Sequence, residues 1–248
     1  MITILASSPT RELNDAYPYP VLNENNRFVE NLKQVWRGAA RCLMIAADPD
    51  AWDLNDEMTG YYRAATENAG LPVACFHLWD SRNPGLTKET FDGYDVIFLA
   101  GGHVPTERAW FEYIQLRWLL QGYDGIVIGT SAGSMNLVQE VYAWPERPGE
   151  SLDPAYELFF EGLGLARTQI LPHYQKVKDI GIDGKLYVQD IARGDSYGKR
   201  FFAIPDGSYV LVCNGTETVF GEALLVSDGQ ISEYCRENEC RLCWPAEN

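Results

Sequence analysis

Short apolar runs alternate along the chain with longer segments of helical period, and this alternation limits the fold more than any other feature. The apolar runs predict strands at residues 2–6, 42–46, 73–78, 96–100, 126–128, 168–171 and 201–204. Between them, apolar spacing predicts helices at residues 55–69, 106–121 and 185–192. Such alternation is typical of an α/β fold, in which a doubly wound, mostly parallel sheet is covered by helices.

After Pro205 the pattern changes to short runs at residues 209–213, 217–220, 223–226 and 230–234. Asn214-Gly215 and Asp228-Gly229 separate these runs, and both pairs favour tight hairpin turns. We therefore expect a C-terminal antiparallel hairpin extension of the sheet. Proline-rich stretches at 11–26 and 144–154 predict surface loops. With no internal repeat, residues 1–248 are expected to form one domain.

The formal net charge of −15, from 20 basic and 35 acidic residues, limits the partners. No cluster of Lys or Arg offsets it, so nucleic acid and anionic membranes should be repelled. The first apolar run is too short for a secretion signal and lacks a basic leader, and no run reaches the roughly 20 residues that span a bilayer. We expect a cytoplasmic protein with no nucleic-acid or membrane partner, and the sequence leaves homo-oligomer formation open.

Six cysteines are present, and the spacing of Cys235, Cys240 and Cys243 is the one sign of a metal site. Structural zinc requires four ligands, and no histidine lies nearby in the sequence. Cys42 and Cys75 lie in apolar runs, where a free thiol packs as a small apolar group. We expect reduced thiols, with neither a metal nor a disulfide framework.

The segment Gly129-Thr130-Ser131-Ala132-Gly133 follows a predicted strand and precedes a helical pattern. A Gly-x-Ser-x-Gly sequence in this position is typical of a nucleophile elbow, whose serine hydroxyl stands above the sheet. The backbone N–H of Ala132 could then face an oxyanion. The alternative is that small residues only permit a tight connection, with Ser131 capping the helix.

A serine nucleophile needs a base to take its proton, and the chain has three histidines. His173 and His103 each follow an apolar run, at the strand ends where an open α/β sheet binds ligands. His77 lies inside a predicted strand and could be a core histidine. We select His173 as the base, and we place His103 near the substrate, as a substrate contact, a partner of other site residues or a polar loop residue.

Asp206, in Pro205-Asp206-Gly207, also follows a predicted strand and could orient the imidazole. An ordinary Asp-Gly turn is at least as good an explanation of these residues alone. The chain order is Ser131, His173, Asp206, whereas α/β-hydrolases have the order Ser-Asp-His. This order disfavours a lipase or esterase of that fold.

Four segments in this order resemble peptidase family S51, serine peptidases that include dipeptidase E and cyanophycinase, with the class I glutamine amidotransferase-like fold. They are Phe98-Leu99-Ala100-Gly101-Gly102-His103, Gly129-Thr130-Ser131-Ala132-Gly133, Pro172-His173-Tyr174 and Ile204-Pro205-Asp206-Gly207. The resemblance implies a triad of Ser131 as nucleophile, His173 as base and Asp206 as acid. It implies an oxyanion hole from the N–H of Ala132 and that of Gly101 or Gly102. No metal or organic cofactor is implied, and the substrate would be a small peptide.

The chain departs from the dipeptidases in three ways. They usually have Asn where this chain has His103, and Glu where it has Asp206. After the histidine they have an arginine-bearing segment, whereas this chain has lysines, so specificity for an N-terminal Asp is not predicted. Two alternatives stay open: an amidase acting on a non-peptide amide, and a non-catalytic binding or stress-response module on the same fold.

Overall fold

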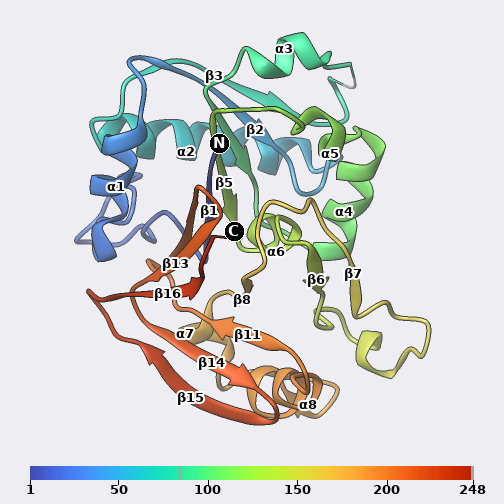
Figure 1. Ribbon diagram of the computed structural model, residues 1–248. Coiled ribbons are helices and arrows are strands. Elements are labelled where there is room, and N and C mark those ends of the chain that lie inside the picture. Colours follow the sequence, from blue (N-terminus) through green and yellow to red (C-terminus); the bar gives the residue numbers. More distant parts are fainter. Residues whose placement is uncertain (84, 247–248) are drawn as a thin grey trace.

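The computed structural model of the chain describes residues 1–83 and 85–246. The largest sheet in this part of the chain has eight strands, in the order β16-β13-β12-β1-β5-β4-β2-β3. In this spatial order, the five strands β1, β5, β4, β2 and β3 are parallel to their neighbours. On the other side of β1, the strands β12, β13 and β16 extend the sheet in antiparallel orientation (Figure 1). The bounds are β1 (Ile2–Ala6), β2 (Ala40–Ile45), β3 (Val73–Trp79), β4 (Val96–Leu99), β5 (Ile126–Thr130), β12 (Tyr209–Cys213), β13 (Thr216–Phe220) and β16 (Cys240–Trp244).

Helices cover both faces of this sheet, because successive side chains of its buried strands point to opposite faces. In β1, Ile4 and Ala6 pack with α1 and α2, whereas Leu5 belongs to the cluster that contains side chains of α3 to α6. The predicted doubly wound α/β fold is therefore confirmed. The bounds are α1 (Phe28–Val35), α2 (Trp52–Asn68), α3 (Lys88–Asp92), α4 (Val104–Tyr113), α5 (Leu116–Leu119) and α6 (Ala132–Asn136).

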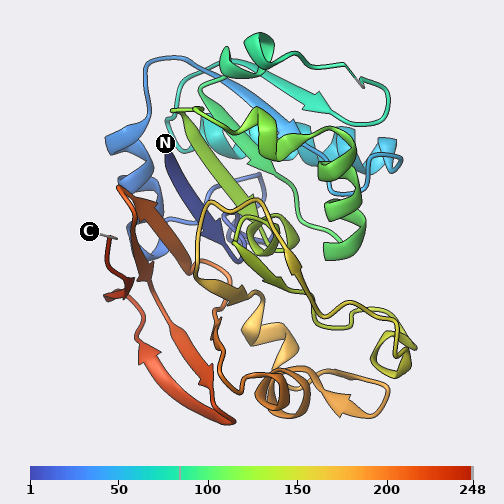
Figure 2. The same ribbon diagram turned by 45° about the vertical axis from the view of Figure 1, so that its right-hand side comes forward.

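A second sheet has four strands, in the order β15-β14-β11-β8, and lies below the first in Figure 2. Its strands are β8 (Gln169–Leu171), β11 (Arg200–Ala203), β14 (Ala223–Ser227) and β15 (Gln230–Cys235). We had expected the runs at 168–171 and 201–204 to join the doubly wound sheet, and all the C-terminal hairpins to extend it. Of the four apolar runs predicted after Pro205, only β12 and β13 extend the large sheet. An apolar run indicates a strand but not the sheet that the strand joins.

Both predicted hairpin turns are present. Asn214 and Gly215 have φ values of 50° and 75° between β12 and β13, and Asp228 and Gly229 have values of 49° and 73° between β14 and β15. Two consecutive positive φ angles match the right-handed twist of paired strands, which explains the preference for Asn-Gly and Asp-Gly.

Two predicted helices differ in the structure. The segment at 106–121 is divided into α4 and α5, because Gln115 adopts a left-handed conformation with φ of 54°. The segment at 185–192 begins as β10 (Lys185–Leu186), which pairs with β9 (Gly181–Ile182), and only then forms the π-helix η3 (Tyr187–Ala192). Asp183 and Gly184 make a further positive-φ turn between β9 and β10, so the helix begins later than predicted.

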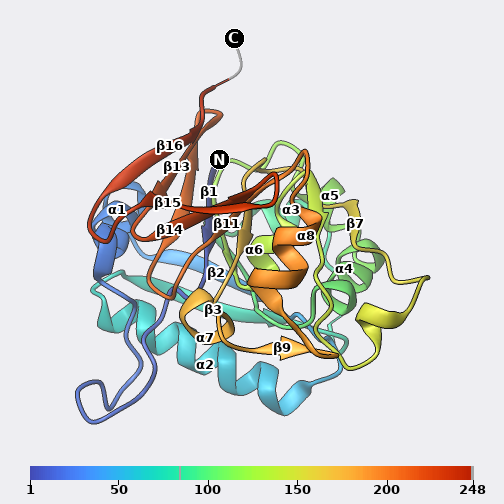
Figure 3. The same cartoon turned by 90° about the horizontal axis from the view of Figure 1, so that it is seen from below.

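Loops and short elements lie between the main strands and helices. Residues 11–26 run from β1 toward α1 as a loop, visible in blue at the lower left of Figure 3. Residues 144–154 also form a loop, although it begins at the buried side chain of Trp144. The remaining short elements are η1 (Asn25–Arg27), β6 (Glu140–Tyr142), η2 (Glu150–Leu152), β7 (Phe159–Glu161), α7 (Tyr174–Val177) and α8 (Arg193–Asp195).

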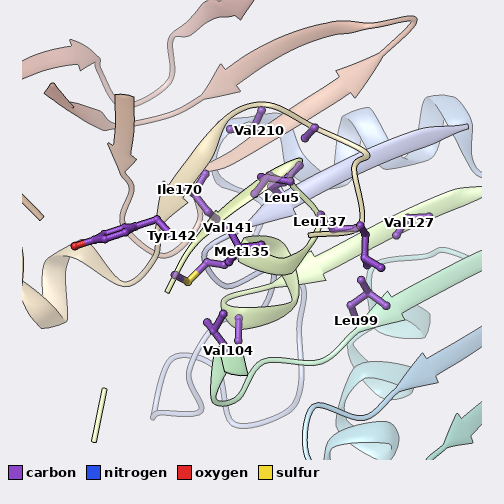
Figure 4. Packing of buried hydrophobic residues seen from close by; sticks show 14 of the residues in the cluster. Leu5, Leu99, Val104, Val127, Met135, Leu137, Val141, Tyr142, Ile170 and Val210 are labelled. Atoms are coloured by element: carbon purple, nitrogen blue, oxygen red, sulfur yellow. The ribbon is translucent and has the colours of Figure 1, made fainter. Parts of the chain in front are cut away.

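One buried cluster contains side chains of both sheets. Figure 4 shows Leu5 and Leu99 of the large sheet, Met135 of α6 and Ile170 of β8 among the side chains of this cluster. Figure 4 also shows Val210 of β12, next to Leu5. Burial of this apolar surface is the main force that holds the second sheet against α6 and the large sheet.

Candidate active site

Ser131 lies directly after β5, at the N-cap position of the short helix α6, and its side chain makes no capping hydrogen bond. Its backbone has φ of 51° and ψ of −114°, a conformation that non-glycine residues rarely adopt. Two backbone hydrogen bonds hold it: the Ser131 N–H donates to the Ala6 carbonyl at 3.0 Å, and the Ser131 carbonyl accepts from the Met135 N–H at 3.0 Å. Strained backbone of this kind occurs where the surrounding structure fixes it, often at functional sites.

The two glycines of the motif permit this turn by close packing. A Cβ atom on Gly129 would lie 2.6 Å from the Ser134 nitrogen, and one on Gly133 would lie 2.5 Å from the Leu99 carbonyl oxygen. Carbon and oxygen or nitrogen atoms do not approach so closely without a bond. Glycine is thus required at both positions for α6 to pack against the end of β4.

Of the three residues of the predicted oxyanion hole, Ala132 directly follows Ser131 and Gly101 packs against it. A Cβ atom on Gly101 would be 3.1 Å from the Ser131 Cβ, so the loop after β4 touches the serine. A Cβ atom on Gly102 would lie 2.7 Å from the Cβ of Ala47. Within residues 1–83 and 85–246, the N–H groups of Gly101, Gly102 and Ala132 donate no hydrogen bond to a protein acceptor. Their role in an oxyanion hole stays a prediction.

His173 and Asp206 are in direct contact. Nδ1 of His173 lies 2.6 Å from Oδ1 of Asp206, and both side chains are largely buried, at 29% and 17% exposure. His173 follows β8 and has a left-handed backbone with φ of 59°, while Asp206 follows β11. Because β8 and β11 are parallel neighbours, their carboxyl ends bring the two residues together.

Three further side chains hold the Asp206 carboxylate. The Ser7 hydroxyl donates to Oδ1 at 2.8 Å, the Gln175 amide donates to Oδ2 at 2.6 Å, and the Lys176 ammonium forms an ion pair at 3.0 Å. Burial of Asp206 raises its pKa, but the hydrogen bond and charge of His173, with the bonds from Ser7 and Lys176, outweigh burial and hold the pKa below its ordinary value. Asp206 is therefore ionised at neutral pH.

The end of β1 connects the serine turn to the histidine. Ala6 accepts the hydrogen bond of the Ser131 N–H, and the next residue, Ser7, accepts that of the His173 N–H at 2.7 Å. The structure thus brings the segments of Ser131, His173 and Asp206 to the same end of β1.

His103 lies at the start of α4, beside Gly102. Its Nδ1 lies 2.8 Å from the Thr106 hydroxyl and its Nε2 lies 3.2 Å from a Glu150 carboxylate oxygen. Burial and the charge of Arg147 lower the pKa of His103, against the opposing effect of Glu150. Both ring nitrogens therefore have protein partners, and His103 connects α4 to the loop at 144–154. Its contact with a substrate stays a prediction.

The third histidine and the cysteine cluster lie outside this site. His77 is exposed on the edge strand β3, where its Nδ1 lies 2.8 Å from the Tyr94 hydroxyl, so the core interpretation of His77 is wrong. All six cysteines are free. In the part of the chain that the structure describes, no group of three or more His, Cys, Asp or Glu side chains could hold a metal ion.

The sequence model of peptidase family S51 matches residues 49–220, more than half of the chain. The chain belongs to peptidase family S51. It is therefore a serine-type peptidase, as the resemblance of the four motifs predicted. The matched region contains all the predicted site residues, from Gly101 to Asp206, and leaves out the elements from β1 to β2 and the last three strands.

A solved structure has the same fold. It is a crystal structure from Listeria monocytogenes EGD-e, described provisionally as a peptidase E protein, with a TM-score of 0.55 and 14% sequence identity. The similarity covers 88% of this chain and 96% of the Listeria chain. No curated protein matches the chain. Across residues 1–83 and 85–246, none of the helices has the length and apolar character needed to cross a membrane.

Three side chains around the proposed triad of this S51 peptidase were not predicted from the sequence. Gln175 and Lys176 lie two and three residues after His173 and bind the Asp206 carboxylate, whereas the sequence suggested only that lysines replace the arginine of the dipeptidases here. Ser7 was not considered, because it lies far from the other motifs in the sequence. It follows the first strand, however, and polar residues at strand ends are the signal that could have identified it.

Proposed function

We propose that this S51 peptidase is an exopeptidase for small peptides, similar to dipeptidase E, and that Ser131, His173 and Asp206 form its triad. The observation that carries the proposal is the 2.6 Å contact between His173 and Asp206, whose segment meets the strained turn of Ser131 at the end of β1. A carboxylate on Nδ1 leaves Nε2 as the nitrogen that can accept the serine proton.

The reaction follows from these positions. Ser131 Oγ attacks the peptide carbonyl carbon and gives its proton to His173, while the amides of Ala132 and of Gly101 or Gly102 bind the anionic oxygen. His173 then passes the proton to the departing amine, and the acyl-enzyme forms. Water hydrolyses the ester, again with His173 as base, and Ser131 is released.

Asp206 keeps the imidazole in the tautomer that this sequence requires. Its lowered pKa supports the assignment, because an ionised carboxylate is needed to stabilise the imidazolium that forms in each step. The shorter side chain of Asp, compared with the usual Glu, is compatible with direct contact to Nδ1.

Labelling and hydrolysis test the proposal together. A fluorophosphonate probe should label the wild-type protein at Ser131, and Ser131→Ala should abolish labelling. Free dipeptides should be hydrolysed faster than dipeptides blocked at the amino terminus, and Ser131→Ala or His173→Ala should reduce kcat/KM by about 1000-fold or more, because triad members act as a unit. A loss below tenfold in either variant would place the chemistry on other residues.

The same panel distinguishes the alternatives. Hydrolysis of simple amides without hydrolysis of peptides would favour an amidase. A folded protein that never reacts with the probe would favour a non-catalytic module, and this result would contradict the proposed triad.

A further inference from the structure

Ser7 is a buried polar residue that the proposed reaction does not use. It directly follows β1, and none of its surface is exposed. Its hydroxyl has two partners from distant parts of the chain: it donates to Asp206 Oδ1 at 2.8 Å and accepts from the His173 N–H at 2.7 Å. One hydroxyl therefore contacts both the proposed base and the proposed acid.

The direction of these two bonds is fixed by chemistry. A serine hydroxyl has one hydrogen, and a backbone N–H can only donate, so the bond from His173 leaves the hydroxyl hydrogen free for Asp206. The acceptor, Oδ1, is the same oxygen that lies 2.6 Å from His173 Nδ1. Ser7 and the imidazole thus bind one carboxylate oxygen, and Ser7 determines where this oxygen lies.

The backbone of His173 gives the second bond its importance. His173 has φ of 59° and ψ of 32°, a left-handed conformation that a residue with a side chain adopts at a cost. The bond to Ser7 holds the N–H of this residue and so helps to keep its imidazole directed to Asp206.

The strand before Ser7 is a firm support. β1 pairs with β12 on one side and with β5 on the other, so it has neighbours along both edges. Its last residue, Ala6, also accepts the Ser131 N–H at 3.0 Å. The end of β1 therefore touches all three segments of the proposed triad.

We propose that Ser7 is a positioning residue for the Ser131, His173 and Asp206 reaction. The inference rests on the proposed function, and it extends the site to a segment outside residues 49–220, the region that matches the family. Ser7 acts through Asp206 and His173, so its loss should slow the reaction and leave peptide binding unchanged.

A double-mutant cycle tests this role. Ser7→Ala should lower kcat and the rate of fluorophosphonate labelling by about 10- to 100-fold, with KM within twofold of wild type, because two bonds to the triad are lost. In an Asp206→Asn background the same substitution should lower the labelling rate by a clearly smaller factor, because the ionised carboxylate that Ser7 positions is already gone and only the bond to the His173 N–H remains to be lost.

Two further variants serve as controls. Ser8→Ala removes the neighbouring hydroxyl, which donates to the Thr10 carbonyl at 3.1 Å, and should leave kcat within twofold. Ser7→Cys keeps the size of the side chain but is a weaker donor, so its kcat should lie between those of wild type and Ser7→Ala. Ser7→Cys also decides the question if Ser7→Ala fails to fold.

The outcomes separate this inference from the proposed function. If Ser131→Ala keeps its activity or Asp206→Asn is unimpaired, the triad itself is wrong. If both of these variants are inactive or nearly so, but Ser7→Ala has a kcat within twofold of wild type, only the role of Ser7 is overturned. Equal losses from Ser7→Ala in the wild-type and Asp206→Asn backgrounds would show a merely structural effect and would also overturn it.

Discussion

Gly133→Ala should destabilise the protein and slow its catalysis. The added Cβ would lie 2.5 Å from the Leu99 carbonyl oxygen and 2.7 Å from that of Ala100. Both are backbone atoms at the end of β4, so the conflict cannot be removed by rotation of a side chain. Either α6 or this end of β4 must move by about half an ångström.

The size of the effect follows from this overpacking. Forcing an extra methyl group into a packed interior costs about 1–3 kcal/mol. In a chain of this length each kcal/mol lowers Tm by about 2–4 °C, so we expect a decrease of about 2–12 °C in a thermal melt followed by circular dichroism. Because Gly101 follows Ala100 and touches Ser131, fluorophosphonate labelling should also slow by about tenfold or more.

The matched control is Gly60→Ala, which makes the same chemical change in the exposed interior of α2. No atom lies within 4 Å of the Cβ that would be added, and Gly60 has no positive φ. Alanine is the better helix former, so this variant should gain about 0.5–1 kcal/mol and keep its labelling rate. If Gly133→Ala melts at or above the wild-type Tm, the packing argument for the motif glycines is refuted.

Two further predictions concern pH and are measured by urea unfolding. The lowered pKa of Asp206 means that this residue stabilises the fold fully above about pH 4 and that this contribution decreases as the pH falls below 4. The difference in unfolding free energy between wild type and Asp206→Asn should shrink accordingly, and a constant difference from pH 3 to 7 would contradict the assignment. Burial raises the pKa of Glu107 well above its ordinary value, opposed by the Asn136 hydrogen bond and assisted by the charge of Glu146. The unfolding free energy should therefore fall as the pH rises from 5 to 8, because the folded state resists ionisation of Glu107. Glu107→Gln should reduce this fall. If the dependence of the unfolding free energy on pH is unchanged in Glu107→Gln, Glu107 is not protonated in the folded state.

Local sequence patterns predicted the fold class well, because the period of apolar residues follows directly from the geometry of helices and strands. The strand at 2–6 and that at 209–213 have the predicted bounds. The division into two sheets could not be predicted in this way. The apolar runs at 168–171 and 201–204 could form strands of either sheet. Which sheet they join depends on long-range packing against α6.

The placement of the proposed triad residues was predicted as far as each can be derived from its own segment, whereas their catalytic roles stay a prediction. Ser131, His173 and Asp206 were expected after strands, and they follow β5, β8 and β11. The partners of His103 were not predicted, because Glu150 is distant in the sequence and belongs to a loop without a periodic pattern. The contacts of Ser7 were missed for the same reason.

The separation into two sheets has a consequence for catalysis. Ser131 comes from the large sheet, while His173 and Asp206 come from the neighbouring parallel strands β8 and β11 of the second sheet. The distance between the proposed nucleophile and the proposed base therefore depends on how the sheets pack, and not on the geometry of either one. Hydrogen bonds from the end of β1 to both segments connect them where the sheets meet, and Leu5, Met135 and Ile170 of the two sheets and α6 belong to one buried cluster. A reaction that tolerates errors of less than about 1 Å needs such a link between its two halves.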